Sequence, residues 1–145
     1  MEHYVPLIRE FAARDELFHD AVARKLGLHP TDEKVLRLLG QQTVSAGDLA
    51  DYMGLTGAAV TAMVDRLETL GYVTRERDGA DRRRVKIRAV PAKLASINRI
   101  YRGLHAAMDA MLADYNEAEF KTVVDYLTRT TKVLAEQTRK LGDGN

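Results

Sequence analysis

Apolar side chains recur every three or four residues along most of the chain, with polar side chains between them. This period is typical of helices that bury one face. The first such run lies in residues 1–27, at Tyr4, Ile8, Phe11, Phe18 and Val22. We therefore expect a first amphipathic helix that runs to Gly27.

A break at residues 28–30 separates this helix from a short second one. Thr31 is the expected N-cap of the second helix, and Asp32 and Glu33 place negative charge in its first turn, where the helix dipole favours it. Gly40 is the expected stop. The pattern therefore predicts a short second helix.

Two further helices joined by a tight turn are predicted next. Ser45, with Asp48 three residues later, forms a capping pair for the first of them, and Gly54 ends it. Thr56 caps the second helix, which Gly71 closes. Two short helices with this spacing are typical of a helix-turn-helix.

The second of these helices has two distinct faces. The apolar face, expected to be buried, consists of Val60, Met63, Val64, Leu67 and Leu70. The outward face consists of Ala58, Thr61, Ala62, Asp65 and Thr69. Any helical hairpin has one exposed face, so this pattern alone fits an ordinary hairpin as well as a surface that reads DNA.

The residues that follow alternate between apolar and polar, which predicts strands at residues 72–77 and 84–90. In the second strand Val85, Ile87 and Ala89 face one side, and Arg84, Lys86 and Arg88 face the other. The segment DGADRR supplies a turn between the strands. A β-hairpin directly after a helix-turn-helix is a wing, and Arg82 and Arg83 fall at its tip.

The positive charge of the chain is concentrated in this hairpin. The formal net charge of all 145 residues is +1, yet residues 75–88 hold seven basic and three acidic side chains. Duplex DNA carries one phosphate charge per about 1.7 Å, so clustered Lys and Arg gain affinity for it. An arginine at the tip can also enter the minor groove, and Asp81 is expected to hold Arg83 extended. The alternative is a merely solvated charged face.

The composition excludes several other classes of function. The chain is 46% hydrophobic and 30% charged, as in globular proteins, and has no cysteine, which excludes disulfides and thiolate chemistry. It has no signal-peptide pattern and no apolar run of about 18 residues, so we expect a cytoplasmic protein with no membrane contact.

The histidines do not predict a catalytic site. His3, His19, His29 and His105 are scattered, and neither a glycine-rich phosphate loop nor a nucleophile elbow occurs. We expect no enzyme, no cofactor and no bound metal. A metal site built from His19, His29 and nearby carboxylates is the weaker alternative.

Residues 91–141 contain a heptad pattern, with apolar positions at Leu94, Ile97, Tyr101, Leu104, Met108, Met111 and Tyr115. After a capping box formed by Asn116 and Glu119, it continues at Phe120, Val124, Leu127, Thr131, Leu134, Thr138 and Leu141. An intramolecular hairpin covers only part of these helices, each about 37 Å long at about 1.5 Å per residue. We therefore expect a two-fold homodimer formed by the N- and C-terminal helices.

The chain resembles the MarR family of bacterial winged helix-turn-helix regulators. The segment LTGAAVTAMVDRLETLGYVTRE is similar to the family's recognition helix and first wing strand, and DGADRR is similar to its wing signature DPxDRR. Arg83 then matches the wing-tip arginine and Asp81 its acidic partner. The chain departs from the family at Gly79, where proline is usual, at Ala62, where arginine is common, and at AVPAK, where LTPxG usually opens the next helix.

The resemblance implies one chain, residues 1–145, that is mainly α with a small β-hairpin wing. Residues 31–90 form the winged helix-turn-helix region, and residues 1–27 and 91–141 form the dimerisation helices. The expected DNA contacts are Ser45, Thr56, Gly57, Ala58, Ala59, Thr61, Ala62, Arg66, Arg75, Asp81, Arg82, Arg83 and Arg84.

The function predicted from these features is a homodimeric regulator, a repressor, that binds a pseudo-palindromic double-stranded operator. The resemblance also implies a small-molecule effector that binds between the dimer helices and the winged region, although no residue identifies it. The alternative is a helical dimeric ligand-binding or protein-interaction module with only non-specific DNA affinity. Arg82, Arg83 and Arg84 speak against that alternative.

Overall fold

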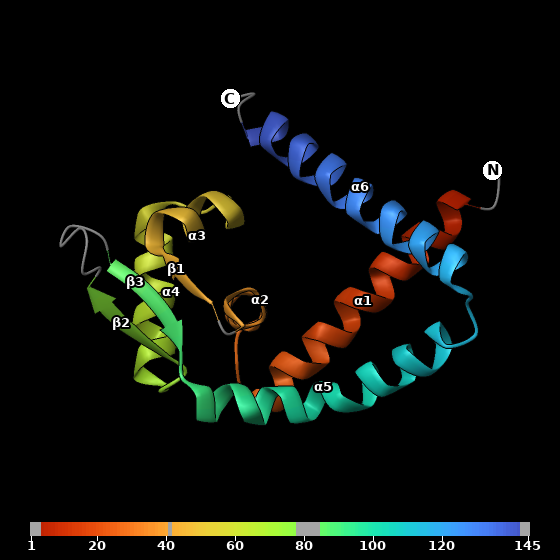
Figure 1. The fold of residues 1–145 in the computed structure, drawn as a ribbon. Coiled ribbons are helices and arrows are strands. Elements are labelled where there is room, and N and C mark those ends of the chain that lie inside the picture. The colour runs from red at the N-terminus through yellow and green to blue at the C-terminus, as the bar shows by residue number, and fades with distance from the viewer. Residues whose placement is uncertain (1–3, 41, 78–84, 143–145) are drawn as a thin grey trace. The chain divides into compact units, whose positions relative to one another are not determined.

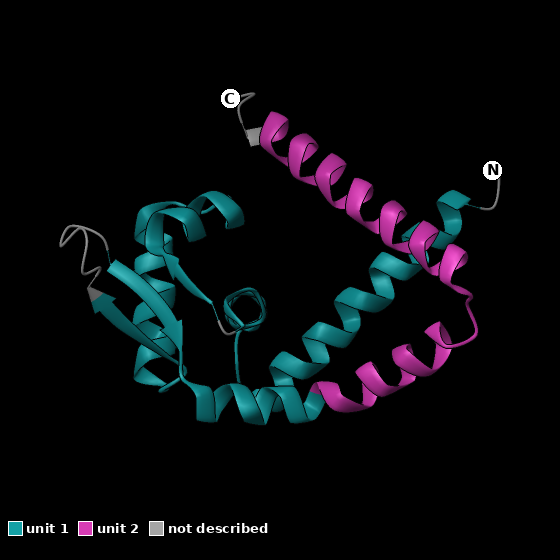
Figure 2. Ribbon diagram, viewed as in Figure 1, with its two compact units in different colours: residues 1–100 teal, residues 101–145 magenta. Residues whose placement is uncertain are grey.

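The computed structural model describes residues 4–40, 42–77 and 85–142, and Figure 1 shows their helices and strands. The chain divides into two compact units, residues 1–100 and residues 101–145 (Figure 2). Most described residues are helical, and the three strands found among them lie in the first unit. The predicted class, mainly α with a small β wing, is confirmed.

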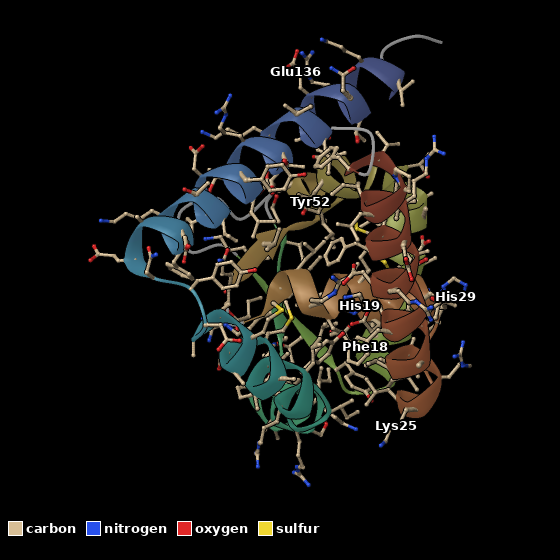
Figure 3. The ribbon with its side chains drawn as sticks, turned by 90° about the vertical axis from the view of Figure 1, so that its right-hand side faces the viewer. Phe18, His19, Lys25, His29, Tyr52 and Glu136 are labelled. Carbon is tan, nitrogen blue, oxygen red and sulfur yellow. The ribbon has the colours of Figure 1, made fainter. Side chains whose placement is uncertain are left out.

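The first unit begins with helices α1 (Tyr4–Leu26) and α2 (Pro30–Leu39). The start of α2 corrects one prediction, because the N-cap is not Thr31 but His29, which is labelled in Figure 3. The Nδ1 atom of His29 accepts a hydrogen bond from the backbone N–H of Thr31 at 3.2 Å. Pro30 occupies the first helical position, where its fixed φ suits the helix and its missing N–H loses no bond.

The helix-turn-helix consists of α3 (Ala46–Met53) and α4 (Gly57–Thr69), and a short strand, β1 (Thr43–Ser45), precedes it. Both helices start directly after the predicted caps, Ser45 and Thr56. Gly54 ends α3 with a φ of 62°, a left-handed backbone conformation that residues with a side chain rarely adopt. The tight turn predicted between the two helices is therefore present.

The wing strands β2 (Val73–Arg77) and β3 (Val85–Ala89) pair antiparallel, with Val73 opposite Ala89. Strand β1, which the sequence did not predict, pairs antiparallel with the other side of β3, with Val44 opposite Ile87. The strand order is therefore β1-β3-β2. A hairpin of two strands is marginally stable alone, so the third strand anchors the wing to the rest of the unit.

The core of the first unit draws on helices α1–α4 and on the sheet. Its buried side chains include Val22, Val35, Leu36, Leu39, Leu49, Met63, Leu67, Val73 and Ile87. Side chains from α2, α3, α4 and β3 are thus all removed from water together, which fixes the position of α4 within the unit.

Two long helices complete the chain, α5 (Pro91–Leu112) and α6 (Glu117–Gly142). The predicted capping box separates them. Asn116 accepts hydrogen bonds from the N–H groups of Ala118 and Glu119 at 3.0 and 3.1 Å, and the Glu119 carboxylate accepts the Asn116 N–H at 2.9 Å. These bonds satisfy the free N–H groups at the start of α6.

The apolar pattern predicted for these helices is buried only at its beginning, at Leu94, Ile97 and Tyr101. Farther along, large apolar side chains are exposed: Met108, Met111, Tyr115, Phe120, Val124, Leu127, Leu134 and Leu141. Tyr4, Leu7 and Phe11 of α1 are exposed as well. In spite of these apolar residues, none of the described helices has the length and apolar character needed to cross a membrane.

Candidate nucleic-acid interface

The second helix of the helix-turn-helix, α4, buries one face and exposes the other, as predicted. Val60, Met63, Val64 and Leu67 are buried, whereas Leu70, expected beside them, is the C-cap residue and is 43% exposed. The exposed residues include Ala58, Thr61, Ala62, Asp65 and Thr69. The outward face therefore presents methyl groups, two hydroxyl groups and a carboxylate.

The hydroxyl groups at the two helix starts act as caps. Thr56 Oγ1 accepts the N–H of Ala59 at 3.2 Å, and Ser45 Oγ accepts the N–H of Asp48 at 3.0 Å and donates to its Oδ2 atom at 2.7 Å. Gly57 has nothing within 4 Å of the place where a Cβ would stand. These predicted DNA contacts thus lie at helix N-termini, whose N–H groups and dipole favour a phosphate.

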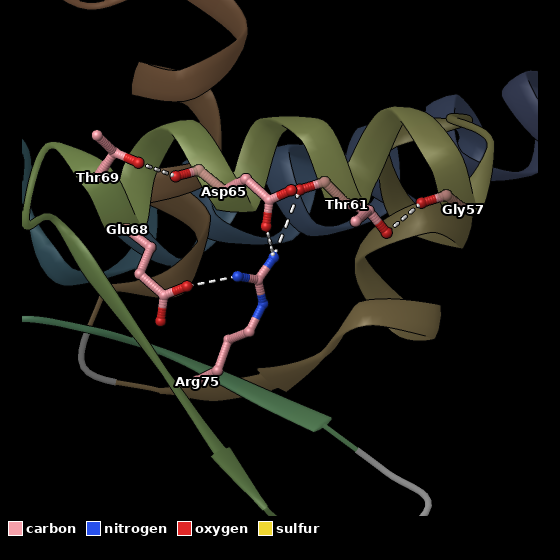
Figure 4. Close-up of polar contacts among 6 residues, drawn as sticks. All are labelled: Gly57, Thr61, Asp65, Glu68, Thr69 and Arg75. Carbon is pink, nitrogen blue, oxygen red and sulfur yellow. Dashed lines mark hydrogen bonds and ion pairs between the residues drawn. The ribbon is translucent and has the colours of Figure 1, made fainter.

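The threonines on the outward face of α4 use their hydroxyl protons within the helix. Thr61 Oγ1 donates to the Gly57 carbonyl at 2.9 Å, and Thr69 Oγ1 donates to the Asp65 carbonyl at 2.8 Å (Figure 4). Each hydroxyl therefore offers DNA its lone pairs and its neighbouring methyl group. Such groups can accept an amino hydrogen from a base or contact the methyl group of thymine.

Arg75, on β2, reaches across to α4 (Figure 4). Its Nη1 donates to the Glu68 carboxylate and its Nη2 to the Asp65 carboxylate, and Nη2 lies 3.5 Å from the Thr61 carbonyl oxygen. The hydrogen bond to Asp65 is the largest cause that raises the pKa of Arg75, and it outweighs the opposing effect of burial. Arg75, predicted as a DNA contact, is thus a charged partner of two acids on α4.

Arg66 of α4 is paired in a different direction, with Asp32 of α2. Its Nε donates to Asp32 Oδ2 at 2.7 Å and its Nη2 to Oδ1 at 2.5 Å. These hydrogen bonds raise the pKa of Arg66, so the guanidinium stays charged. The sequence predicted for Asp32 only a favourable interaction with the helix dipole. Its pairing with Arg66 was missed because the two residues lie 34 positions apart, and so no local pattern indicates it.

The tip of the wing carries the other predicted contacts. Asp81, Arg82, Arg83 and Arg84 lie outside the described residues, so their roles stay predictions. In the described part of the wing the predicted alternation holds only in part. Ile87 and Ala89 are buried and Arg88 is exposed, but Val85 is 38% exposed and Lys86 is half-buried. Val85 lies beyond the stretch of β3 that pairs with β1, which begins at Lys86. The Nε atom of Arg88 lies 3.3 Å from Thr43 Oγ1 and 3.7 Å from Glu76 Oε1.

The two histidines considered as metal ligands have separate surroundings. His29 caps α2 through Nδ1. His19, on α1, lies between two carboxylates, with Nε2 3.4 Å from Asp15 and Nδ1 3.6 Å from the buried Glu33. Within residues 4–40, 42–77 and 85–142 the structure contains no group of three or more His, Asp or Glu side chains arranged to hold a metal ion.

A cavity of about 580 Å³ lies in the first unit beside α1, α2 and the turn between α3 and α4. Its volume is in the range of small-molecule sites. The apolar lining residues are Phe11, Ala12, Pro30, Met53 and Leu55, and the charged ones are Asp15, Glu16, Asp20, Glu33, Lys34 and Arg37. His19 and Thr31 complete the lining, and Glu33 lies 3.6 Å from both His19 and Arg37. Acids still outnumber Lys and Arg in the lining.

Known proteins share this architecture. The model of the MarR family matches residues 26–84. The chain is 37% identical over 138 residues to the uncharacterized HTH-type transcriptional regulator YcgE of Bacillus subtilis (strain 168), and the match covers 94% of this chain and 90% of YcgE. A mutant of MepR from a multidrug resistant S. aureus clinical isolate has a TM-score of 0.75 and 19% identity, covering 90% of this chain and 96% of that chain. Another S. aureus MepR mutant, bound to an oligodeoxyribonucleotide, has a TM-score of 0.59 and 19% identity, covering 90% of this chain and 97% of that chain.

A helix-turn-helix followed by a β-hairpin that pairs with a short strand before the motif defines a winged-helix DNA-binding protein. The match to the family model and the extensive identity to YcgE make the class specific: the chain belongs to the MarR family. The family is one of transcriptional regulators, and YcgE is described as an HTH-type transcriptional regulator, so the protein is a DNA-binding transcriptional regulator and not an enzyme.

Proposed function

We propose that the protein is a cytoplasmic homodimeric repressor that binds a pseudo-palindromic operator and leaves it when a small molecule binds. The observation that carries this proposal is the outward face of α4, which is exposed on a helix held in place by the buried residues of its other face. A rigid helix with one accessible face is what insertion into the major groove requires.

Exposed apolar residues on the terminal helices support the homodimer. On α6 alone Phe120, Val124, Leu127 and Leu134 are exposed, and Leu134 is 62% exposed. Contiguous apolar surface of this kind marks an interaction site, and a second copy of the chain carries the same surface. A two-fold dimer then sets two recognition helices about 34 Å apart, which matches half-sites one DNA turn apart.

The cavity beside α1 and α2 supports control by a ligand. A molecule bound there contacts α1 through Phe11, α2 through Pro30 and the turn before α4 through Leu55. Because it touches the helix-turn-helix and the N-terminal helix together, it can favour one placement of α4 over another. The acidic lining leads us to expect an effector with an amine or other cationic group and an apolar body.

The alternative function, a helical dimer with only non-specific DNA affinity, makes a different prediction. Such a protein binds every duplex equally through its wing, and its affinity depends on salt but not on sequence. A sequence-specific regulator instead prefers its operator by a factor of about 10³ or more at physiological salt.

The experiment that tests the proposal is selection of bound fragments from the source genome, followed by titration of the best fragment and of random DNA over a range of salt. We expect one palindromic family of fragments and a log K that falls linearly with log salt for both duplexes. Equal affinity for selected and random DNA would establish the alternative. Release of the fragment is then screened with organic cations, matched against carboxylic acids of similar size.

A further inference from the structure

The outward side of α4 carries more negative than positive charge, although it belongs to the helix that approaches DNA. Asp65 and Glu68 are exposed, whereas Arg66, the one basic residue in Gly57–Thr69, is bonded to Asp32 of α2. Phosphate charges follow one another about every 1.7 Å along a duplex. Two bare carboxylates at this surface would therefore weaken the binding of any DNA sequence.

Arg75 bonds to both of these carboxylates from the neighbouring strand β2 and so offsets their charge, while the Asp65 and Glu68 side chains stay 60% and 41% exposed. Its two terminal nitrogens are divided between them, Nη1 on Glu68 and Nη2 on Asp65 (Figure 4). The planar guanidinium suits such a fork, and 30% of the Arg75 side chain remains exposed. Two of the N–H groups of Arg75 are therefore used in bonds to α4. An arginine that contacts a phosphate would instead keep these N–H groups free for the DNA.

We infer that Arg75 is a positioning residue that masks Asp65 and Glu68, and that it thereby sets which bases α4 can read. This inference rests on the proposed DNA binding. A carboxylate in the major groove accepts a hydrogen bond from the N4 amino group of cytosine. With both carboxylates held by Arg75, the outward face offers bases its methyl groups, which suit the methyl group of thymine, and hydroxyl lone pairs, which accept from the amino group of either adenine or cytosine.

The competing role for Arg75 is a direct phosphate contact, and salt dependence separates the two roles. Each phosphate neutralised by a basic side chain adds about 0.9 to the slope of log K against log salt. A mask changes affinity without changing the number of phosphates contacted. If Arg75 masks the two acids, Arg75→Ala therefore keeps the wild-type slope. If Arg75 contacts a phosphate, Arg75→Ala lowers the slope by about one unit.

The decisive experiment measures operator affinity for wild type, Arg75→Ala, the double variant Asp65→Asn with Glu68→Gln, and the triple variant. We expect Arg75→Ala alone to weaken binding roughly tenfold, as two unmasked acids face the duplex. Once both acids are neutral, we expect the loss of Arg75 to cost little. An equal cost of Arg75→Ala in both backgrounds, or a slope lower by about one unit, would overturn the inference.

The control variant is Arg129→Ala on α6, which removes one positive charge from an exposed pair with Asp125, 3.5 Å away, in the second unit. We expect its operator affinity to equal that of wild type. This result would exclude the change in net charge as the cause of the weaker binding of Arg75→Ala. Thermal melting of each variant at one concentration shows whether the fold is retained. A less stable fold would weaken binding by the same factor in both backgrounds, so it would change neither the slope of log K against log salt nor the difference between the costs of Arg75→Ala in the two backgrounds.

Selection of binding sites from random duplexes tests base reading. Arg75→Ala should tolerate or prefer cytosine at positions that face α4, compared with wild type, and unchanged preferences there would overturn this part of the inference. If wild type itself selects no sequence, the proposed function fails. If wild type selects an operator and Arg75→Ala behaves as a phosphate contact, only the inference fails.

Discussion

The guanidinium of Arg66 on α4 makes two hydrogen bonds with the carboxylate of Asp32 on α2, and the two partners differ sharply in their access to water. The Asp32 side chain is 1% exposed, whereas that of Arg66 is 47% exposed. The pair joins the recognition helix to the helix that precedes the helix-turn-helix. Loss of the arginine leaves a buried negative charge, whereas loss of the charge on Asp32 leaves an arginine that water can solvate.

We therefore predict that Arg66→Ala lowers the free energy of unfolding by about 2–3 kcal/mol. This is below the ~3–5 kcal/mol of a fully buried pair, because about half of Arg66 is already in water. Asp32→Asn keeps the shape of the acid and should cost about 1–2 kcal/mol. Urea unfolding at one protein concentration measures both values, and equal costs would show that water reaches Asp32 once Arg66 is removed.

A second prediction concerns the start of α2. His29→Ala removes the cap and should lower the free energy of unfolding by about 0.5–1 kcal/mol, whereas His29→Asn keeps an acceptor at this position and should retain stability. Thr31→Ala is the matched control, with an expected change within about 0.5 kcal/mol. A larger cost for Thr31→Ala than for His29→Ala would place the cap at Thr31 after all.

A third prediction concerns the apolar residues of α6. Leu134→Lys places a charge on the apolar side of the helix and should shift the protein from dimer to monomer, as measured by light scattering across a dilution series. Arg129→Ala changes the opposite side of α6 and should leave the dimer intact. Truncation after Asp114 should give an unstable or monomeric product, and a well-folded dimer of that fragment would place the interface elsewhere.

The fourth prediction comes from the sequence of the wing tip. Arg83→Ala should weaken operator binding by about 1–3 kcal/mol, most at A·T-rich flanks, and leave the dimer unchanged. Asp81→Ala should weaken binding less, because it frees Arg83 to adopt other rotamers although it also removes a negative charge. Tighter binding by Asp81→Ala at physiological salt would show that Asp81 does not hold Arg83.

Local signals in the sequence were sufficient for most of the fold. Ser45, Thr56 and Asn116 cap the helices that they were predicted to cap, because a cap depends on residues within one helical turn. The prediction of Thr31 was wrong because histidine is not among the common cap residues, although its Nδ1 atom can accept a hydrogen bond. Strand β1 was missed because three residues are too few to show an alternation.

The surface of the candidate site was predictable, but the partners of its arginines were not. Hydrophobic spacing placed Thr61, Ala62 and Asp65 on the outward side of α4, and they are exposed. The pairs of Arg66 with Asp32 and of Arg75 with Asp65 join different elements. Such contacts depend on tertiary packing, which the charge pattern of one segment does not contain.

The position of β1 also bears on how the protein avoids aggregation. With the order β1-β3-β2, the two strands at the borders of the sheet are β1 and β2. Unpaired backbone groups on a border strand can template the addition of another chain. Strand β1 has only three residues, and β2 carries Arg75 and Glu76 in adjacent positions. The shortness of β1 and the charged side chains of β2 oppose the addition of a further strand, so the central strand β3, with its buried Ile87 and Ala89, stays between its two partners when the protein is concentrated.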